Sequence, residues 1–177
     1  QGVDAVIINQ ILAAAMPNMV RSPPLVRYLW GLWTGQEVGI CDLSGTGIIS
    51  IRRDILDLTC TTKLLLSYNR LVALPQQLTA LTQLITIDLS HNQLTMLPSF
   101  FGALTWLREL DLSYNMLNSL PKEMAQLTNW SYPRNPLAMH LFSTSWAAGN
   151  PLTFPHEQIL QLGPDQTRGF LRQVGAA

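Results

Sequence analysis

Aromatic and acidic side chains recur at regular intervals in the middle of this 177-residue chain. Tyr68, His91 and Tyr114 lie 23 residues apart, and Asp88 and Asp111 share that interval. A stack of carboxylates could bind a cation, whereas a Tyr-His-Tyr series offers rigid aromatic groups with hydrogen-bonding tips, the chemistry favoured at protein interfaces. The spacing therefore raises two possibilities, a cation site and a binding surface.

The other reactive residue types do not form a catalytic set. His91, His140 and His156 lie far apart in sequence and in different predicted elements, so neither a shared metal nor an acid-base pair is expected. Gly45 and Gly47 fall in a predicted turn rather than in a phosphate-binding loop. The aspartates belong to a recurring LDLS motif, which accounts for them without a cation. We therefore expect a protein that is not an enzyme and has no cofactor or metal.

A repeat of 23 residues positions these side chains. Asn69, Asn92 and Asn115 occupy the same place in the segments TTKLLLSYNRLVALP, LITIDLSHNQLTMLP and LRELDLSYNMLNSLP. A fixed period of this length, with leucines in constant slots, is the pattern of a leucine-rich repeat. One period earlier, Thr46 replaces the asparagine in the degenerate copy VGICDLSGTGIISI. The pattern predicts an α/β solenoid of about five coils, with a parallel sheet on its concave side.

Strand periodicity separates the predicted core from the predicted surface. Alternate strand residues face opposite sides, so the leucine slots point inward, and the asparagine amides are expected to form a ladder that satisfies turn backbone groups. Pro75, Pro98 and Pro121 should begin the convex return segments. The predicted core comprises Val38, Cys41, Leu43, Ile48, Ile51, Leu64, Leu66, Leu71, Leu74, Leu78, Leu81, Ile87, Leu89, Leu94, Leu97, Phe101, Leu104, Leu110, Leu112, Leu117, Leu120, Met124 and Leu127.

The outward positions differ from copy to copy, and these differences are where a partner could be recognised. We expect the aromatic stripe to be either a set of contact residues or plain surface. Trp106 fills a slot held by Cys60, Gln83 and Asn129 in the other copies, so the repeat does not require it, and an exposed tryptophan there would mark a second contact patch. The predicted concave contacts are Lys63, Leu65, Tyr68, Asp88, His91, Glu109, Asp111 and Tyr114.

The flanking segments predict end caps. Residues 3–16 read as an amphipathic helix, either a cap on the first coil or a segment that docks onto a partner. Residues 21–29 read as a linker, after which Trp30 and Trp33 are expected to pack over the cap. The predicted divisions are residues 1–37 for the N-terminal cap and linker, 38–154 for the repeats, irregular from 128, and 155–177 for a helical C-terminal cap.

Two registers are possible for the last coil. Asn135 comes three residues before the expected position 138, and Asn150 comes twelve residues after it. We favour Asn150, because AAGNPLTFP leads directly into a helix-like segment. Beyond it, HEQILQLG and PDQTRGFLRQ predict two short helices, the second starting at Pro164, with Ile159, Leu160, Leu162, Phe170 and Leu171 on the apolar face.

Composition narrows the classes of partner. The net charge is zero, so neither a nucleic-acid backbone nor an anionic membrane is an expected partner. Charged residues form 12% of the chain, about half the usual share, which suggests burial in a larger assembly. Cys41 and Cys60 are too few for disulfide-clasped caps and favour an intracellular, cytoplasmic location. The uncharged residues 5–20 are too short to span a bilayer, and Gln1 in first place suggests a fragment or a trimmed chain.

The repeat over residues 38–127 has the form LPxxLxxLxxLxxLDLSxN and resembles the intracellular leucine-rich repeats of the Ras-associated and plant type. This resemblance implies a curved right-handed solenoid that binds protein. A second resemblance is to the repeat domain of carbon-catabolite-repressor-type poly(A) deadenylases. It is carried by Trp30 and Trp33 before the repeats, the degenerate first copy, and the segments GNPL and ILQLGPDQTRGFL. That likeness implies binding to a partner deadenylase, with a separate nuclease domain for the chemistry, although the irregular fifth coil departs from the pattern.

Two hypotheses of function follow. The first is a non-catalytic adaptor that holds a protein partner of unknown identity on its concave face. The second is a docking or regulatory domain of a larger enzyme, such as a deadenylase. A recognition module of an immune-type sensor is a further alternative.

Overall fold

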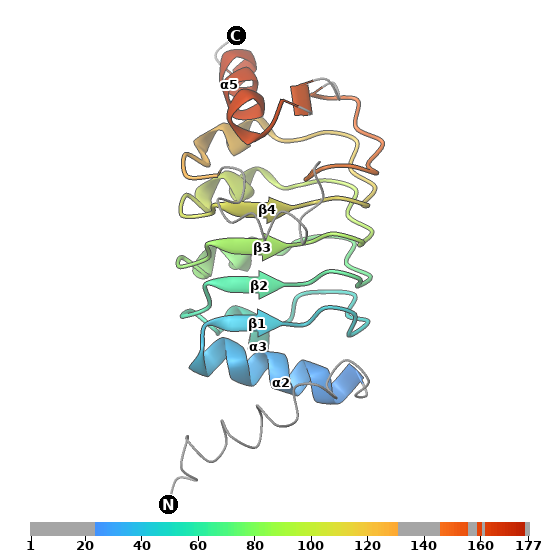
Figure 1. Ribbon diagram of the computed structural model, residues 1–177, viewed down its shortest axis with the longest axis vertical. Coiled ribbons are helices and arrows are strands. Elements are labelled where there is room, and N and C mark those ends of the chain that lie inside the picture. The colour runs from blue at the N-terminus through green and yellow to red at the C-terminus, as the bar shows by residue number, and fades with distance from the viewer. Residues whose placement is uncertain (1–23, 131–145, 156–158, 161, 176–177) are drawn as a thin grey trace, which may run out of the picture.

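The computed structural model describes residues 24–130, 146–155, 159–160 and 162–175. Its coils stack along the long axis of the molecule, and the first four each contribute one strand to a continuous sheet (Figure 1). The strands are β1 (Ile40–Asp42), β2 (Lys63–Leu65), β3 (Thr86–Asp88) and β4 (Glu109–Asp111), all parallel and paired in chain order. Ile40, Lys63, Thr86 and Glu109 stand in register, which confirms the period of 23 residues.

Short helices return the chain on the opposite side of each coil. They are α3 (Arg53–Leu56) and the 3₁₀ helices η1 (Gln76–Ala80), η2 (Ser99–Ala103) and η3 (Lys122–Gln126). Each 3₁₀ helix follows a proline with extended backbone, Pro75, Pro98 or Pro121, as predicted. Proline suits this position because the first amide of a helix has no intrahelical partner.

The leucine slots form one apolar core that runs the length of the coils. Of the core slots predicted in the second to fourth copies, every one is buried. The first copy departs from the prediction at Val38, which is 59% exposed because it continues directly from a helix, with its N–H bonded to the carbonyl of Thr34. Ile48 is half-buried against the core.

The predicted asparagine ladder is present. The Nδ2 of Asn92 donates to the carbonyl oxygens of Leu66 at 2.9 Å and Leu89 at 3.0 Å, while its Oδ1 accepts from the N–H of Leu71 at 3.0 Å. Asn69 and Asn115 make the corresponding bonds, each to its own turn and to the coil before it. Each asparagine therefore satisfies backbone groups of its own turn and of the preceding coil.

Asn150 is the next member of this ladder. Its Nδ2 donates to the carbonyl of Leu112 at 2.8 Å, and its Oδ1 accepts from the N–H of Leu117 at 3.0 Å. The N–H groups of Leu112 and Tyr114 bond to the carbonyls of Trp146 and Ala148, so the pairing continues beyond β4. These bonds confirm Asn150 as the turn of the last coil; Asn135 lies outside the described residues.

The first coil can do without an asparagine because a helix precedes it instead of another coil. Thr46 fills the slot, and its Oγ1 donates to the carbonyl of Leu43 at 2.7 Å and lies 3.3 Å from the Oδ1 of Asn69. A threonine satisfies a group within its own turn but is too short to reach back to a preceding coil as the longer amide does. The degenerate copy is thus an adaptation to the end of the array.

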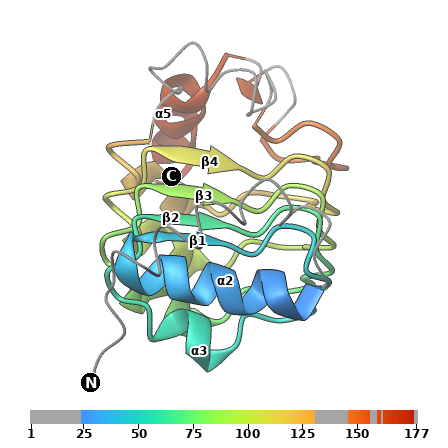
Figure 2. The same ribbon diagram turned by 60° about the horizontal axis from the view of Figure 1, so that its bottom comes forward.

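The N-terminal end is covered by α2 (Pro24–Glu37), which packs against β1 (Figure 2). Gly31 and Gly35 are its buried residues, and a Cβ on Gly35 would lie 2.8 Å from Cδ1 of Leu58. The expected linker over 21–29 is wrong from Pro24 onward, because a proline at the first turn of a helix costs no hydrogen bond. Trp30 and Trp33 are partly buried on α2, with ring centroids 5.7 Å apart. The predicted helix over 3–16 lies outside the described residues.

The C-terminal end is covered by α5 (Pro164–Gly175), which starts where predicted and packs against η3. Arg168 of α5 donates to the carbonyls of Leu127 at 2.8 Å and Thr128 at 2.7 Å, which satisfies acceptors at the end of the fourth coil. Leu171 is buried as expected, but Leu162 is 62% exposed, because it lies in the turn that precedes α5. Of the preceding predicted helix, residues 156–158 and 161 lie outside the described residues.

Candidate functional site

The strand residues that face away from the core differ in how far solvent reaches them. In the first column, Lys63 is exposed, Thr86 is buried and Glu109 is partly buried. The hydroxyl of Thr86 donates to Oε2 of Glu109 at 2.8 Å, so the two side chains hold each other across β3 and β4. Lys63 and Glu109 are therefore the accessible charges of this column.

The aspartate column has a local structural role. Oδ1 of Asp88 accepts the N–H of Ser90 at 2.9 Å and its hydroxyl at 2.7 Å. Asp42 and Asp111 accept the N–H two residues on in the same way, at 3.0 and 2.8 Å. Such bonds fix the start of a turn, which explains the LDLS motif. Among the residues that the structure describes, no cluster of three metal-ligating side chains occurs.

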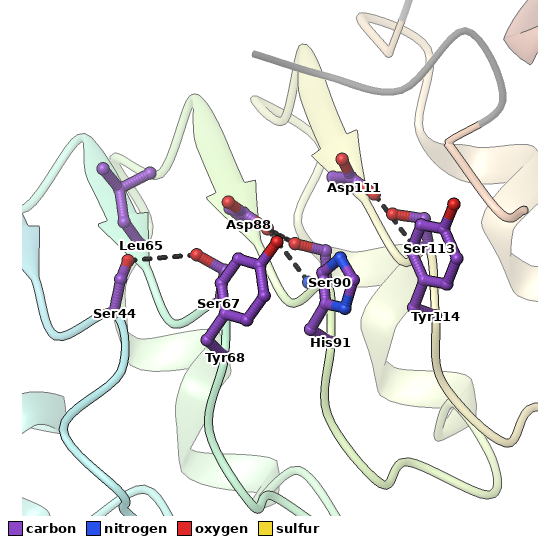
Figure 3. Close-up of a pocket in the computed structure, with 10 residues that line it drawn as sticks. All are labelled: Ser44, Leu65, Ser67, Tyr68, Asp88, Ser90, His91, Asp111, Ser113 and Tyr114. Carbon is purple, nitrogen blue, oxygen red and sulfur yellow. Dashed lines mark hydrogen bonds between the residues drawn. The ribbon is translucent and has the colours of Figure 1, made fainter. Parts of the chain in front are cut away.

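The aromatic residues form a stack along the sheet, which we call the ring column: Tyr68, His91 and Tyr114. The ring centroids of Tyr68 and His91 are 4.1 Å apart with planes inclined by 10°, and those of His91 and Tyr114 are 4.4 Å apart with planes inclined by 13°. The rings follow one another from coil to coil (Figure 3). Tyr68 is 64% and Tyr114 52% exposed, so the column stands open to solvent.

Each residue of the ring column has a left-handed backbone. Their φ angles are 56°, 52° and 54°, values at which an L-residue is strained by about 1 to 2 kcal/mol. The same position is glycine in the first and last coils, at Gly45 with φ 62° and Gly149 with φ 69°. The turn before the asparagine thus demands a left-handed residue. Stacked aromatic pairs contribute about 0.5 to 1.5 kcal/mol each and can offset this strain.

The sequence could have revealed this constraint only indirectly. Aromatic residues have no preference for positive φ, and the signal was the glycine in the same slot of the first and last coils, Gly45 and Gly149. Sequence reasoning also missed Arg27 of α2, whose guanidinium lies against Gly45 and donates to the carbonyls of Ser44 and Gly45. The ring column therefore ends at a guanidinium on the side of α2.

A groove runs beside the ring column on the concave face. It encloses about 370 Å³. The rings of Tyr68, His91 and Tyr114 form one side and the aspartate column the other, with serines between them (Figure 3). Between the two sides, the hydroxyl of Ser67 donates to the hydroxyl oxygen of Ser44 at 3.1 Å. The lining residues are Ser44, Leu65, Ser67, Tyr68, Asp88, Ser90, His91, Asp111, Ser113 and Tyr114.

The structure brings most of the predicted contacts together here. Leu65, Tyr68, Asp88, His91, Asp111 and Tyr114 line the groove, whereas Lys63 and Glu109 stand in the adjoining column. Asp111 is only 3% exposed, so it is less accessible than predicted.

Trp106 lies apart from the groove and is 62% exposed. A small hollow of about 140 Å³ adjoins it, between the return segments of the second and third copies, those of Asn69 and Asn92. Its lining is part apolar and part hydroxyl, including Leu81, Thr82 and Thr105. This exposure agrees with the expectation that the repeat itself does not require a tryptophan in this slot.

The two cysteines are free, and they differ in their surroundings. Cys41 is fully buried in the first coil, and this burial raises the pKa of its thiol to about 12, with a smaller contribution from the charge of Asp42. Cys60 is partly exposed and lies 3.3 Å from the carbonyl of Gln36. Burial, and after it the hydrogen bond to Asp54, likewise raises the pKa of the Tyr28 hydroxyl.

Residues 59–117 match the family model for the leucine rich repeat. The chain is a leucine-rich repeat solenoid. A solved leucine-rich repeat protein of Leptospira interrogans shares its fold, with 28% sequence identity and a TM-score of 0.53 over 63% of this chain and 26% of that one. Leucine-rich repeats are commonly interaction modules and are generally non-enzymatic. A search of curated protein sequences finds no match.

Two further solved structures are similar to this leucine-rich repeat solenoid. The functional domain of InlJ from Listeria monocytogenes is 27% identical, with a TM-score of 0.49 over 64% of this chain and 21% of that one. The BIR2 ectodomain from Arabidopsis thaliana is 23% identical, with a TM-score of 0.45 over 60% and 51%. The chain spans about a quarter of the length of the Leptospira and Listeria proteins. No helix in the described part of the solenoid is long and apolar enough to cross a membrane.

Proposed function

We propose that this leucine-rich repeat solenoid is a non-catalytic binding module that holds a protein partner on its concave face. The observation that carries the proposal is the ring column, three stacked aromatic side chains on a left-handed backbone, of which Tyr68 and Tyr114 are exposed and His91 is partly buried. Large aromatic side chains are the residues most often found to dominate binding energy at interfaces.

The geometry of the ring column favours binding for an entropic reason. Each ring is restrained by its neighbours in the stack and by a fixed turn, so little side-chain freedom remains to be lost when a partner docks. The tips of Tyr68 and Tyr114 carry hydroxyls that can donate or accept hydrogen bonds. The column thus combines apolar area with directional groups, as an anchor at the centre of an interface does.

The surrounding residues fit the role of a rim. Lys63, Leu65, Asp88 and Glu109 lie next to the column and are partly or fully exposed. Asp111 is buried, so its contribution is to hold the turn at Ser113. Trp106 would provide a second contact on another side of the solenoid.

An intracellular setting within a larger assembly is part of the proposal. Free thiols at Cys41 and Cys60 support a reducing compartment. A docking domain of a larger enzyme, such as a deadenylase, would use the same concave face, and it would differ in having a catalytic domain elsewhere in the protein.

The test is an affinity purification that compares the parent with the double variant Tyr68→Gly, Tyr114→Gly. Glycine is native at this position in the first and last coils, so the substitution removes the rings while relieving backbone strain. We expect an unchanged fold by circular dichroism and loss of partners that the parent retains, as identified by mass spectrometry. Gln93→Ala, an exposed change just beyond the turn, is the matched control. Equal recovery of every partner by parent and double variant would refute the concave-face assignment.

A further inference from the structure

The two sides of the groove differ in chemistry. The ring column supplies ring edges and hydroxyl groups, and the opposite side supplies carboxylates and the side chain of Leu65 (Figure 3). A volume of about 370 Å³ suits individual side chains of an extended segment rather than a folded surface. The occupant must therefore present both polar and apolar atoms to the groove.

Among the described residues, the outward strand positions of this face carry more carboxylates than basic groups. Arg70 and Arg108 lie outside the strand columns, at exposed positions after the turn and before β4. The outward positions of β1 to β4 carry four carboxylates and one amine, those of Asp42, Asp88, Glu109, Asp111 and Lys63.

Asp88 has the capacity to bind a cation from outside the chain. Both of its donors within the described residues, the N–H and the hydroxyl of Ser90, reach Oδ1, which leaves the lone pairs of Oδ2 for another donor. Its side chain is partly buried, where an ion pair is screened less by salt than on an open surface. Leu65, its neighbour in the column, offers apolar area for the aliphatic stem of a lysine or arginine.

The fold already places a guanidinium beside this surface. Arg27 reaches from α2 to the end of the ring column. Its Nη1 lies 3.3 Å from the position that a Cβ on Gly45 would occupy. Arg27 donates to the carbonyls of Ser44 and Gly45 there. Its positive charge offsets part of the carboxylate charge at this edge, so a basic group from elsewhere is expected farther along the groove, at Asp88.

We propose that the protein partner presents an extended basic segment to this groove. A lysine or arginine of that segment pairs with Oδ2 of Asp88 and packs its stem between Leu65 and the ring column. This inference rests on the proposed function, because it assumes that the concave face binds protein, and it adds the class of sequence that is bound.

Short labelled peptides test the class of ligand directly. We compare alternating arginine-glycine, lysine-glycine and glutamate-glycine peptides by fluorescence anisotropy with the whole chain. The basic peptides should bind, more weakly as salt is raised, and the acidic peptide should not. Equal binding of acidic and basic peptides, or binding of neither, overturns the proposal.

Two isosteric variants locate the site. Asp88→Asn keeps an oxygen for the N–H of Ser90 but removes the charge. It should lower the affinity for the basic peptides about fivefold. Asp57→Asn removes an exposed carboxylate from the return segment after α3 and should leave binding unchanged. Equal effects of the two variants would show non-specific attraction and overturn the proposal. If the rings are needed to capture partners but basic peptides do not bind, the ligand class is wrong and the binding face stands.

Discussion

The ring of Tyr114 lies over the backbone of Gly149. A Cβ at Gly149 would stand 2.7 Å from Cδ1 and 3.1 Å from Cε1 of that ring, closer than packed atoms can approach. The φ of 69° independently favours glycine. Gly149 thus adopts the left-handed backbone that the last turn requires, and it also leaves room for the ring of Tyr114 at the end of the ring column.

Gly149→Ala should destabilise the protein more than an equally strained glycine elsewhere does. Gly47 is the matched control, because its φ is 77° and no atom lies within 4 Å of its added Cβ. Gly47→Ala should cost about 1 kcal/mol from backbone strain alone. Gly149→Ala should cost at least about 1 kcal/mol more, because the ring of Tyr114 must move. Equal losses in urea unfolding would show that the ring does not rest on Gly149.

Asn92→Ala should lower the free energy of unfolding by about 2 to 3 kcal/mol. The change leaves the carbonyls of Leu66 and Leu89 and the N–H of Leu71 without their partner inside the protein. Asn118→Ala is the control, since that side chain is exposed, and it should change stability by less than about 0.5 kcal/mol. Thermal and urea unfolding measure both, and matching curves for the two variants would contradict the role of the ladder.

Cys41 should make stability depend on pH at the alkaline end. Burial raises its pKa in the folded state from 9.0 to about 12, so the unfolded chain releases this proton first as pH rises. The stabilisation is complete below pH 9 and is lost as pH approaches 12. The difference in unfolding free energy between the parent and Cys41→Ala should therefore shrink over this range. Cys60→Ala, a partly exposed thiol, serves as the comparison, and a constant difference for Cys41→Ala would contradict the shift.

Trp106→Gln should separate binding from folding on the other side of the solenoid. Glutamine is native at Gln83, the same slot one coil earlier, and Trp106 is 62% exposed. The melting temperature should therefore change little, because the core does not depend on this side chain. If Trp106 is a second contact, partners recovered by the parent should be depleted from the variant in quantitative mass spectrometry. Unchanged recovery would remove this patch from the proposed interface.

The repeat could be predicted residue by residue because each slot of a coil has one physical requirement. Leu64, Ile87 and Leu110 share a slot whose burial follows from strand alternation and the period alone. The ends lack that constraint. The proline pair before α2 is compatible with either a linker or a helix start, and Leu162 carries no local sign that a turn will expose it. Contacts such as Arg27 with Gly45 depend on how a helix docks, which no periodicity encodes.

The asparagine ladder gives the solenoid a direction. The turn of each coil is completed by the asparagine of the coil that follows: Leu71 depends on Asn92, and Leu117 on Asn150. Removal of a coil from the C-terminal side would strand buried backbone groups in the coil before it. Removal from the N-terminal side would free an asparagine side chain and also leave backbone N–H groups of the next coil without their acceptor, as that of Gln93 would be without the carbonyl of Leu71. Deletion series from the two ends should therefore expose different amides of the coil that becomes terminal. Hydrogen exchange should speed up at turn amides such as that of Leu71 after C-terminal deletion, and at amides such as that of Gln93 after N-terminal deletion.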